Sequence, residues 1–280
     1  MNIAMVTGAS SGMGKEFARR LILGKDEFCG APFDELWVIA RSHDKLLELK
    51  AELDSARLSD TSANRTQVRV IPLDLTAPDT IAALRDLLQQ EKPSVCLLIN
   101  SAGMGKSGAF ETQSIEDTHS AITLNCTALS EVTSVMLPYM IPLGDSSPKG
   151  KGPRILNIAS SAGFLPQPDF AVYAATKSYV ISFSRALDQE VRSHNIAVTC
   201  VCPGPVDTNF IKVSKNDPNA SFTGFKSKFV TTVDKLIPAA IKASLKGRSM
   251  LVFGFGQKCL HLASKILPTR LIFFFEKGMK

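Results

Sequence analysis

The chain has 280 residues, of which 45% are hydrophobic and 21% are charged, the balance of an ordinary globular protein. Its net charge of +6 comes from scattered side chains, not from a dense basic run with interleaved aromatics, which argues against nucleic-acid binding. Its apolar runs fall short of the ~20 residues needed to span a bilayer.

The cysteines and histidines indicate the redox environment and argue against a metal site. None of the six cysteines forms a CxxC pair, and the four histidines are scattered. We therefore expect buried free thiols in a reducing compartment and no bound metal. No charged segment precedes the first predicted strand, so we expect no signal peptide and a cytoplasmic protein.

Short apolar runs rich in β-branched residues alternate with longer helical patterns along the chain. The predicted strands are Ile3–Thr7, Leu36–Ala40, Val68–Pro72, Val95–Asn100, Arg154–Ala159, Ala197–Cys202 and Met250–Phe253. The predicted helices are Lys15–Leu23, Asp44–Ala56, Asp79–Gln90, Ile115–Tyr139, Tyr173–His194 and Thr232–Leu245. This alternation predicts an α/β protein with a doubly wound, mostly parallel, seven-stranded sheet, because continuous apolar strands are typical of sheets covered on both faces.

Two segments interrupt the alternation, and an apolar tail follows it. Residues 144–153 are a Gly-, Pro- and Ser-rich stretch that we interpret as a connector. Residues 205–230 are polar and turn-rich, and a loop of that length in a compact domain is typical of a lid over a substrate site or of a disordered segment. We assign residues 1–254 to one domain and residues 255–280 to an apolar, helical C-terminal extension of it, in which Pro268 separates two short helices.

A glycine-rich turn follows the first predicted strand and opens the first predicted helix. Glycines there let the backbone approach a pyrophosphate, and the helix N-terminus supplies N–H donors to it. The candidate cofactor-binding residues of this turn are Gly8, Ser10, Ser11, Gly12, Met13 and Gly14.

The ends of the second and third strands suggest which nucleotide binds. Arg41 and Ser42 follow the second strand, where an acidic residue would repel a ribose 2′-phosphate and an arginine accommodates one. This favours NADP(H), although a surface arginine is the alternative. Asp74, followed by Leu75, could accept a hydrogen bond from the adenine amino group or could cap a helix.

The catalytic candidates lie at and after the fifth strand. Tyr173 and Lys177 are four residues apart and therefore share a helix face. A free phenol titrates near pH ~10, and a neighbouring ammonium together with an oxidised nicotinamide would lower that value. Ser160 ends the fifth strand, where its hydroxyl could hold a substrate oxygen, and we interpret the adjacent Ser161 as a turn residue.

Other polar positions flank the expected cofactor. Asn125 lies among apolar neighbours in a helix, which predicts a buried polar network. The remaining cofactor candidates follow the fourth and sixth strands. They are Asn100, Ala102, Gly103, Pro203, Gly204, Val206 and Thr208.

From Ile3 to Thr208, this ordered set of motifs resembles the classical short-chain dehydrogenase/reductase family, with its Rossmann-type fold. The resemblance implies that Tyr173 is the general acid/base and that Lys177 binds ribose and lowers the tyrosine pKa. It also implies that Ser160 orients the carbonyl and that Asn125 supports a proton-relay water. The family's usual Asn-Asn-Ala-Gly is Asn-Ser-Ala-Gly here, and its usual Gly-Ile-Gly is Gly-Met-Gly. Arg41 fits the NADP(H)-preferring branch.

The resemblance implies an NADP(H)-dependent enzyme that interconverts a ketone and a secondary alcohol. An apolar tail is also found in long-chain ketone and hydroxysteroid members, so we expect a bulky apolar substrate such as a steroid. The alternatives are a 3-oxoacyl-thioester reductase and a non-catalytic NADP-binding regulatory protein, which would have no need of a proton donor.

Three interpretations of the tail stay open. We favour packing against the body or a second subunit, then lining of the substrate pocket, then contact with a membrane surface, since its polar positions are basic. We expect a homodimer or homotetramer.

Overall fold

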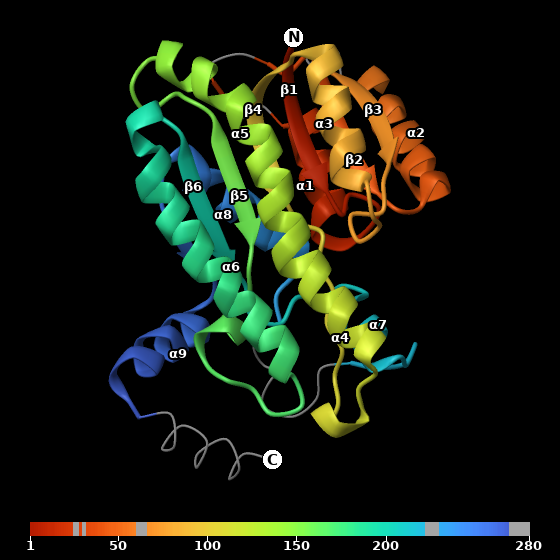
Figure 1. The fold of residues 1–280 in the computed structure, drawn as a ribbon, viewed down its shortest axis with the longest axis vertical. Coiled ribbons are helices and arrows are strands. Elements are labelled where there is room, and N and C mark those ends of the chain that lie inside the picture. The colour runs from red at the N-terminus through yellow and green to blue at the C-terminus, as the bar shows by residue number, and fades with distance from the viewer. Residues whose placement is uncertain (25–27, 30–31, 60–65, 222–229, 269–280) are drawn as a thin grey trace.

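The computed structural model describes residues 1–24, 28–29, 32–59, 66–221 and 230–268. Within them, one sheet of seven parallel strands has the order β3-β2-β1-β4-β5-β6-β7 (Figure 1). The strands are β1 (Asn2–Thr7), β2 (Glu35–Ala40), β3 (Gln67–Pro72), β4 (Ser94–Asn100), β5 (Arg154–Ile158), β6 (Ala197–Cys202) and β7 (Met250–Val252). The predicted Rossmann-type sheet is confirmed.

Helices cover both faces of this sheet, which is why its central strands are apolar almost without interruption. One hydrophobic cluster lies beneath α1 (Gly12–Leu23), α2 (His43–Ser59) and α8 (Val233–Leu245). A second cluster lies beneath α3 (Thr80–Glu91), α5 (Leu129–Ser146) and α6 (Ala171–Glu190). The order of strands reverses between β1 and β4, so the segments that follow these two strands run to opposite sides of the sheet. The crevice between them, at the carboxyl ends of the strands, is where ligands bind in such sheets.

The helical region predicted at 115–139 is longer and less regular than expected. It consists of α4 (Ile115–Ile122), one π-helical turn, η2 (Thr123–Ala128), and α5, which continues through Pro138 and Pro142 to Ser146. Gly144, which we assigned to the connector, is therefore helical. A side chain there would collide with the carbonyl of His194.

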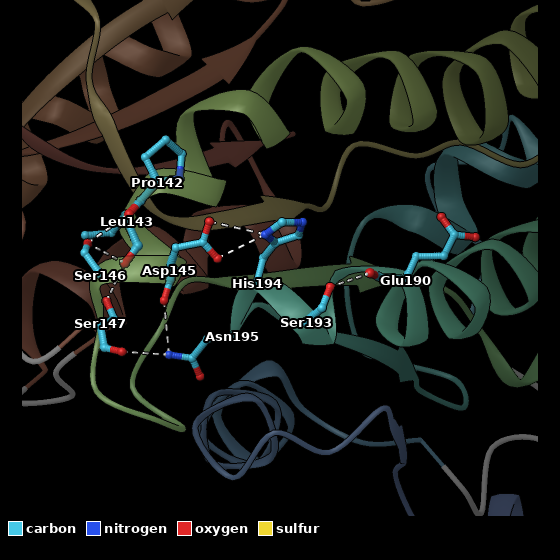
Figure 2. Close-up of polar contacts among 10 residues, drawn as sticks. Pro142, Leu143, Asp145, Ser146, Ser147, Glu190, Ser193, His194 and Asn195 are labelled. Atoms are coloured by element: carbon cyan, nitrogen blue, oxygen red, sulfur yellow. Dashed lines mark hydrogen bonds and ion pairs between the residues drawn. The ribbon is translucent and has the colours of Figure 1, made fainter.

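The connector after α5 is held to the turn that precedes β6. That turn is η4 (Val191–His194) followed by Asn195, whose positive φ of 55° is left-handed. Figure 2 shows the Asn195 amide beside the connector, where it approaches the carbonyl oxygens of Gly144, Ser147 and Pro148 at 3.3, 3.2 and 3.0 Å. His194 Nδ1 lies 3.0 Å from Asp145 Oδ1. This cluster lies at the amino ends of β5 and β6, so its histidine is far from the candidate site.

The segment predicted as a lid contains a helix that the sequence did not indicate, α7 (Phe210–Lys215). A parallel bridge between Val206 and Thr231 joins the two ends of this segment. Residues 222–229 lie outside the described part of the chain. Short 3-10 turns form η1 (Phe110–Thr112) and η3 (Ser161–Phe164).

The chain continues from β7 into α9 (Phe255–Ile266), which packs on η3 and ends before Pro268. The second helix predicted beyond Pro268 falls on residues outside those described. In the described part of the chain, no helix is long and apolar enough to cross a bilayer.

The six cysteines are free. The predicted burial is confirmed for Cys96, Cys200 and Cys202, which lie in the sheet. It is wrong for Cys259, which is exposed on α9, and Cys29 and Cys126 are only partly buried.

Candidate active site

The glycine-rich turn between β1 and α1 lies tightly against the end of β4. Gly8 has a φ of 67°, and a Cβ there would lie 2.7 Å from the Cα of Ala102. A Cβ on Gly14 would collide with the carbonyl of Gly8. Thr7 Oγ1 accepts hydrogen bonds from the backbone N–H groups of Ser101 and Ala102, both at 3.1 Å. The glycines are therefore required by close backbone contacts, as the predicted phosphate-binding turn demands.

The opposite side of this turn faces the segment that follows β6. Gly12 also has a positive φ, of 53°, and a Cβ on it would be 3.6 Å from the Thr208 methyl group. Ser10, Ser11 and Met13 lie between these glycines. The structure thus brings Thr208, predicted from a distant motif, beside the turn.

Arg41 and Asp74 end neighbouring strands, β2 and β3. Asp74 Oδ1 accepts hydrogen bonds from Thr76 N at 2.9 Å and Thr76 Oγ1 at 2.7 Å, so Asp74 closes a local turn. It is not the helix cap that we considered, because the N-cap of α3 is Asp79. Burial raises the pKa of Asp74, but these bonds and the charge of Arg41 lower it more, and the net shift is downward. Arg41 itself is exposed, and Ser42 Oγ accepts from Lys45 N at 3.4 Å at the start of α2. Leu75 is buried.

A buried polar chain links the end of β4 to the helices behind it. Asn100 Nδ2 donates to Thr133 Oγ1 and to Asn157 Oδ1, both at 2.9 Å. Asn157 Nδ2 in turn donates to Ser184 Oγ at 3.0 Å. Asn100 therefore joins β4, β5, α5 and α6, which explains a buried amide at this position.

Asn125 lies in the π-helical turn, the kind of irregularity that often marks functional sites. Its Oδ1 accepts from Met104 N at 2.9 Å, and its Nδ2 donates to Met104 O at 2.8 Å and Thr176 Oγ1 at 3.0 Å. The predicted buried network is thus present. A Cβ on Gly103 would lie 3.3 Å from Asn125 Oδ1 and 3.4 Å from Lys177 Nζ, so these groups converge on Gly103.

Lys177 is buried one helical turn after Tyr173. Its Nζ donates to the carbonyl of Ile158 at 2.9 Å and lies 5.7 Å from the centroid of the Tyr173 ring. Burial lowers the pKa of Lys177 to about 8, although nearby Cys126, Cys200 and Cys202 act in the opposite direction.

Ser160 lies at the end of β5 beside the phenol of Tyr173. Its Oγ accepts from Ala162 N at 3.1 Å and also forms a side-chain hydrogen bond with Tyr173. The adjacent Ser161 instead donates its backbone N–H to Pro203 O at 2.8 Å, as a turn residue does.

The pKa of Tyr173 differs from our expectation. Burial raises the pKa of Tyr173 to about 12, and the hydrogen bond with Ser160 lowers it only in part. The expected lowering by Lys177 is absent: in the protein alone, desolvation of the phenol outweighs the hydrogen bond with Ser160, and Lys177 does not contribute to the shift. A pKa nearer neutrality would need an additional positive charge.

Two aromatic rings that sequence reasoning missed contact Tyr173. The Phe170 ring meets it edge to face at 5.6 Å, and the Phe210 ring of α7 lies 5.2 Å away, measured between centroids. A Cβ on Gly105 would lie 2.7 Å from Tyr173 Cδ2 and 2.9 Å from Phe210 Cζ. The sequence indicated Phe210 only as part of the predicted lid, because a contact between residues as distant in the chain as Tyr173 and Phe210 leaves no local sequence signal.

Gln257 of α9 is a second residue that the sequence did not single out. A Cβ on Gly204, which with Pro203 follows β6, would lie 2.6 Å from Gln257 Nε2. The Gln257 Oε1 atom is buried and has no hydrogen-bond partner among the residues that the structure describes. The same is true of Ser101 Oγ. Such atoms suit a site that holds a ligand with hydrogen-bond donors.

An open apolar pocket of about 360 Å³ borders the site. Its lining residues are Phe164, Leu165, Pro166, Gln167, Pro168, Ala171, Ala174, Ala175 and Ser178. It uses a different face of α6 from the one that carries Tyr173 and Lys177. Within the described residues, no cluster of His, Cys, Asp and Glu could hold a metal ion.

Comparisons with known proteins agree with this geometry. The family model described as short chain dehydrogenase matches residues 2–219. A 3-oxoacyl-[acyl-carrier-protein] reductase of Chlamydia muridarum is 30% identical over 185 residues, which cover 66% of this chain and 71% of that protein.

Two solved structures are similar over nearly the whole chain. One is a short-chain dehydrogenase from Sphingobium yanoikuyae in complex with NADPH, with 27% identity, a TM-score of 0.74, and coverage of 95% of this chain and 94% of that one. The other is a bulky-bulky ketone specific alcohol dehydrogenase from Comamonas testosteroni, with 26% identity, a TM-score of 0.71, and coverage of 95% and 92%.

Proposed function

The chain belongs to the short-chain dehydrogenase family, and from that premise we propose that it is an NADP(H)-dependent oxidoreductase that interconverts a ketone and a secondary alcohol. The observation that carries the proposal is the convergence of Ser160, Tyr173 and Lys177 at the carboxyl end of β5, next to the glycine-rich turn. A merely regulatory nucleotide-binding protein would not need a proton donor there.

The residues present fit a dinucleotide. Gly8 and Gly14 leave a backbone cradle that a Cβ would fill, and α1 begins at Gly12 directly behind it. Arg41 is exposed at the end of β2, where it would contact a ribose 2′-phosphate. The orphaned Oε1 of Gln257 beside Gly204 provides an acceptor for a carboxamide or hydroxyl donor. The related Sphingobium enzyme was solved with NADPH, which supports the same choice.

The other predicted cofactor residues belong to the same proposed site. Asn100, Ala102 and Gly103 end β4 beside the turn, while Val206 and Thr208 follow Gly204 on its opposite side. We propose that they, with Asp74 and Leu75, border the bound nucleotide.

When bound, NADPH would supply the hydride for carbonyl reduction. In the proposed roles, Ser160 holds the carbonyl oxygen and Tyr173 donates its phenolic proton to that oxygen. Lys177 holds the ribose hydroxyls, and Asn125 fixes the backbone of Met104 and supports a water that returns the proton. Burial raises the pKa of Tyr173 to about 12, so the phenol carries the proton that carbonyl reduction requires.

We propose a bulky apolar substrate, with a steroid ketone as the leading candidate. Phe170 and Phe210 surround Tyr173 with apolar surface, and the Comamonas relative is named for bulky ketones. A 3-oxoacyl thioester is the second candidate, favoured by the similarity to the Chlamydia reductase. We also propose a homodimer or homotetramer and a cytoplasmic location; light scattering and cell fractionation would test these.

The test is a screen of steroid, acyl-thioester and sugar ketones that follows NADPH absorbance. We expect the highest kcat/KM with a bulky apolar ketone. The Tyr173→Phe variant should retain at most ~1% of the wild-type kcat/KM, because general-acid catalysis contributes on that scale. A strong preference for acyl thioesters would establish the second candidate instead.

A further inference from the structure

The outward face of α9 carries a stripe of exposed apolar side chains in the part of the chain that the structure describes. Phe255, Cys259, Leu262 and Ile266 follow one another at intervals of four, three and four residues, so they share one face of the helix. The exposed fractions are 83% for Phe255, 60% for Leu262 and 69% for Ile266, and Cys259 is also exposed. We call these four residues the α9 stripe. Single exposed apolar residues are common, but a continuous row of them marks an interaction surface.

The opposite face of α9 is already occupied, so a rotation of the helix could not bury the stripe without exposing that face. Gln257 packs on Gly204, and the His261 ring lies 4.6 Å from that of Phe164 in η3. The helix therefore has one face packed on the protein and a separate apolar face toward the solvent. Figure 1 shows α9 at the edge of the molecule, at the end of the sheet where the candidate site lies.

The charges around the stripe are positive. Lys258 and Lys265 are exposed, and each follows a stripe residue by three positions, so both flank it on one side. From Lys235 to Phe275 the sequence contains no Asp or Glu. Burial lowers the pKa of His261, and the charges of Lys265 and Arg185 lower it further.

We propose that α9 docks the protein on an anionic lipid surface. The α9 stripe enters the boundary between head groups and acyl chains, while Lys258 and Lys265 lie at the level of the lipid phosphates. This would place the site end of the sheet next to the bilayer, where apolar ketones partition. The inference does not depend on the proposed reaction.

A second copy of the chain is a less suitable occupant. In a two-fold contact the same patch meets itself, so Lys258 and Lys265 beside the stripe of one copy would lie near the same lysines of the other copy. The helix offers no acidic residue to pair with them. Anionic lipid provides both the apolar phase and the compensating charge.

The test is flotation of the full-length protein with vesicles of phosphatidylcholine alone and of phosphatidylcholine with phosphatidylglycerol. We expect binding to the anionic vesicles that weakens as salt is raised. Leu262→Ser/Ile266→Ser should weaken it by about tenfold or more, because two large apolar side chains leave the interface. Ile115→Ser is the matched control, since Ile115 is 83% exposed on α4 and should leave binding unchanged.

A second pair of variants tests the charge. Lys258→Glu/Lys265→Glu should abolish the preference for anionic vesicles, whereas Lys149→Glu/Lys151→Glu changes the net charge equally on the exposed connector and should not. Ketone reduction measured without vesicles should be the same in all four variants, so a failure here is distinguishable from a failure of the proposed reaction. Should the double serine variant not fold, as judged by its thermal unfolding, Phe255→Ser supplies the same test.

Three results would overturn the proposal. The first is that the wild-type protein does not float with anionic vesicles. The second is that the control variants lose as much vesicle binding as the stripe variants. The third is that the wild-type protein binds no vesicles while the stripe variants form a smaller particle in light scattering. The last result would assign the stripe to a contact between copies.

Discussion

Lys177 Nζ lies 5.7 Å from the centroid of the Tyr173 ring while it donates to the carbonyl of Ile158 at 2.9 Å. The ammonium is therefore fixed beside the phenol by the backbone of β5, and no acidic side chain among the described residues pairs with it. Lys177 is buried and Tyr173 is partly buried. Desolvation favours the neutral form of each group, so it raises the pKa of the phenol to about 12 and lowers that of the amine to about 8.

Tyr173→Phe removes the proton donor and keeps the ring that packs on Phe170 and Phe210. We expect turnover to fall by at least ~10²-fold, with NADPH affinity nearly unchanged. Single-turnover hydride transfer and a fluorescence titration of NADPH would measure the two effects. A variant that retained a tenth of the activity would remove Tyr173 from the central role.

Arg41→Ala removes the charge proposed to contact the 2′-phosphate. A charge-assisted hydrogen bond is worth roughly 1.5–3 kcal/mol, so NADPH should bind at least about tenfold more weakly. NADH lacks the phosphate and should bind as before, which makes it the control in a side-by-side titration. If the wild-type protein already preferred NADH, the assignment of Arg41 would be wrong.

Lys177 gives the stability of the protein a specific pH dependence. Its pKa is about 8 when folded, below the ordinary value of 10.5. Between these values the unfolded chain binds a proton that the folded one has lost, so stability rises with pH in that window. Relative to Lys177→Met, the wild-type protein should gain on the order of 3 kcal/mol from pH 8 to 10.5.

Urea unfolding of both proteins without cofactor, at pH 7.5 and again near pH 10, would measure this difference. Other groups that titrate cancel in the comparison. A stability difference that did not change with pH would mean that Lys177 is solvated in the folded protein.

Gly105→Ala introduces a methyl group where only 2.7 Å separates the new Cβ from Tyr173 Cδ2. The phenol must shift, and we expect kcat to fall by about tenfold or more, because small misplacements of catalytic groups are costly. Phe210→Ala removes the other ring near that Cβ, so the double variant should recover part of the activity. If the single Gly105→Ala variant and the double variant with Phe210→Ala had equal activity, Phe210 would not constrain Tyr173.

Gln257→Leu replaces a buried amide with an apolar side chain of similar size. The free energy of unfolding should stay equal or rise, by up to about 1–3 kcal/mol, because an unpaired buried acceptor is removed. Ligand binding should weaken: a change in NADPH affinity would indicate a contact with the cofactor, and a change in KM alone a contact with the substrate. A destabilised variant with normal binding would show that Gln257 is only a packing residue.

The sequence by itself determined the parts of this protein that depend on local rules. Backbone sterics required the glycines of the turn at Gly8–Gly14, and helical periodicity placed Tyr173 and Lys177 on one face of α6. Because parallel strands end at the same edge, the motifs after β1, β4, β5 and β6 could be expected to meet. The boundary of the domain at Gly254 stays a prediction.

The tertiary structure alone decided what depends on distant segments. The packing of α7 and α9 brought Phe210 and Gln257 to the site, and it left the α9 stripe uncovered. It also set the pKa of Tyr173, since the cost of desolvation depends on everything that surrounds the phenol. Local periodicity fixes which residues share a face of one element, but which surfaces then meet depends on the packing of the whole chain.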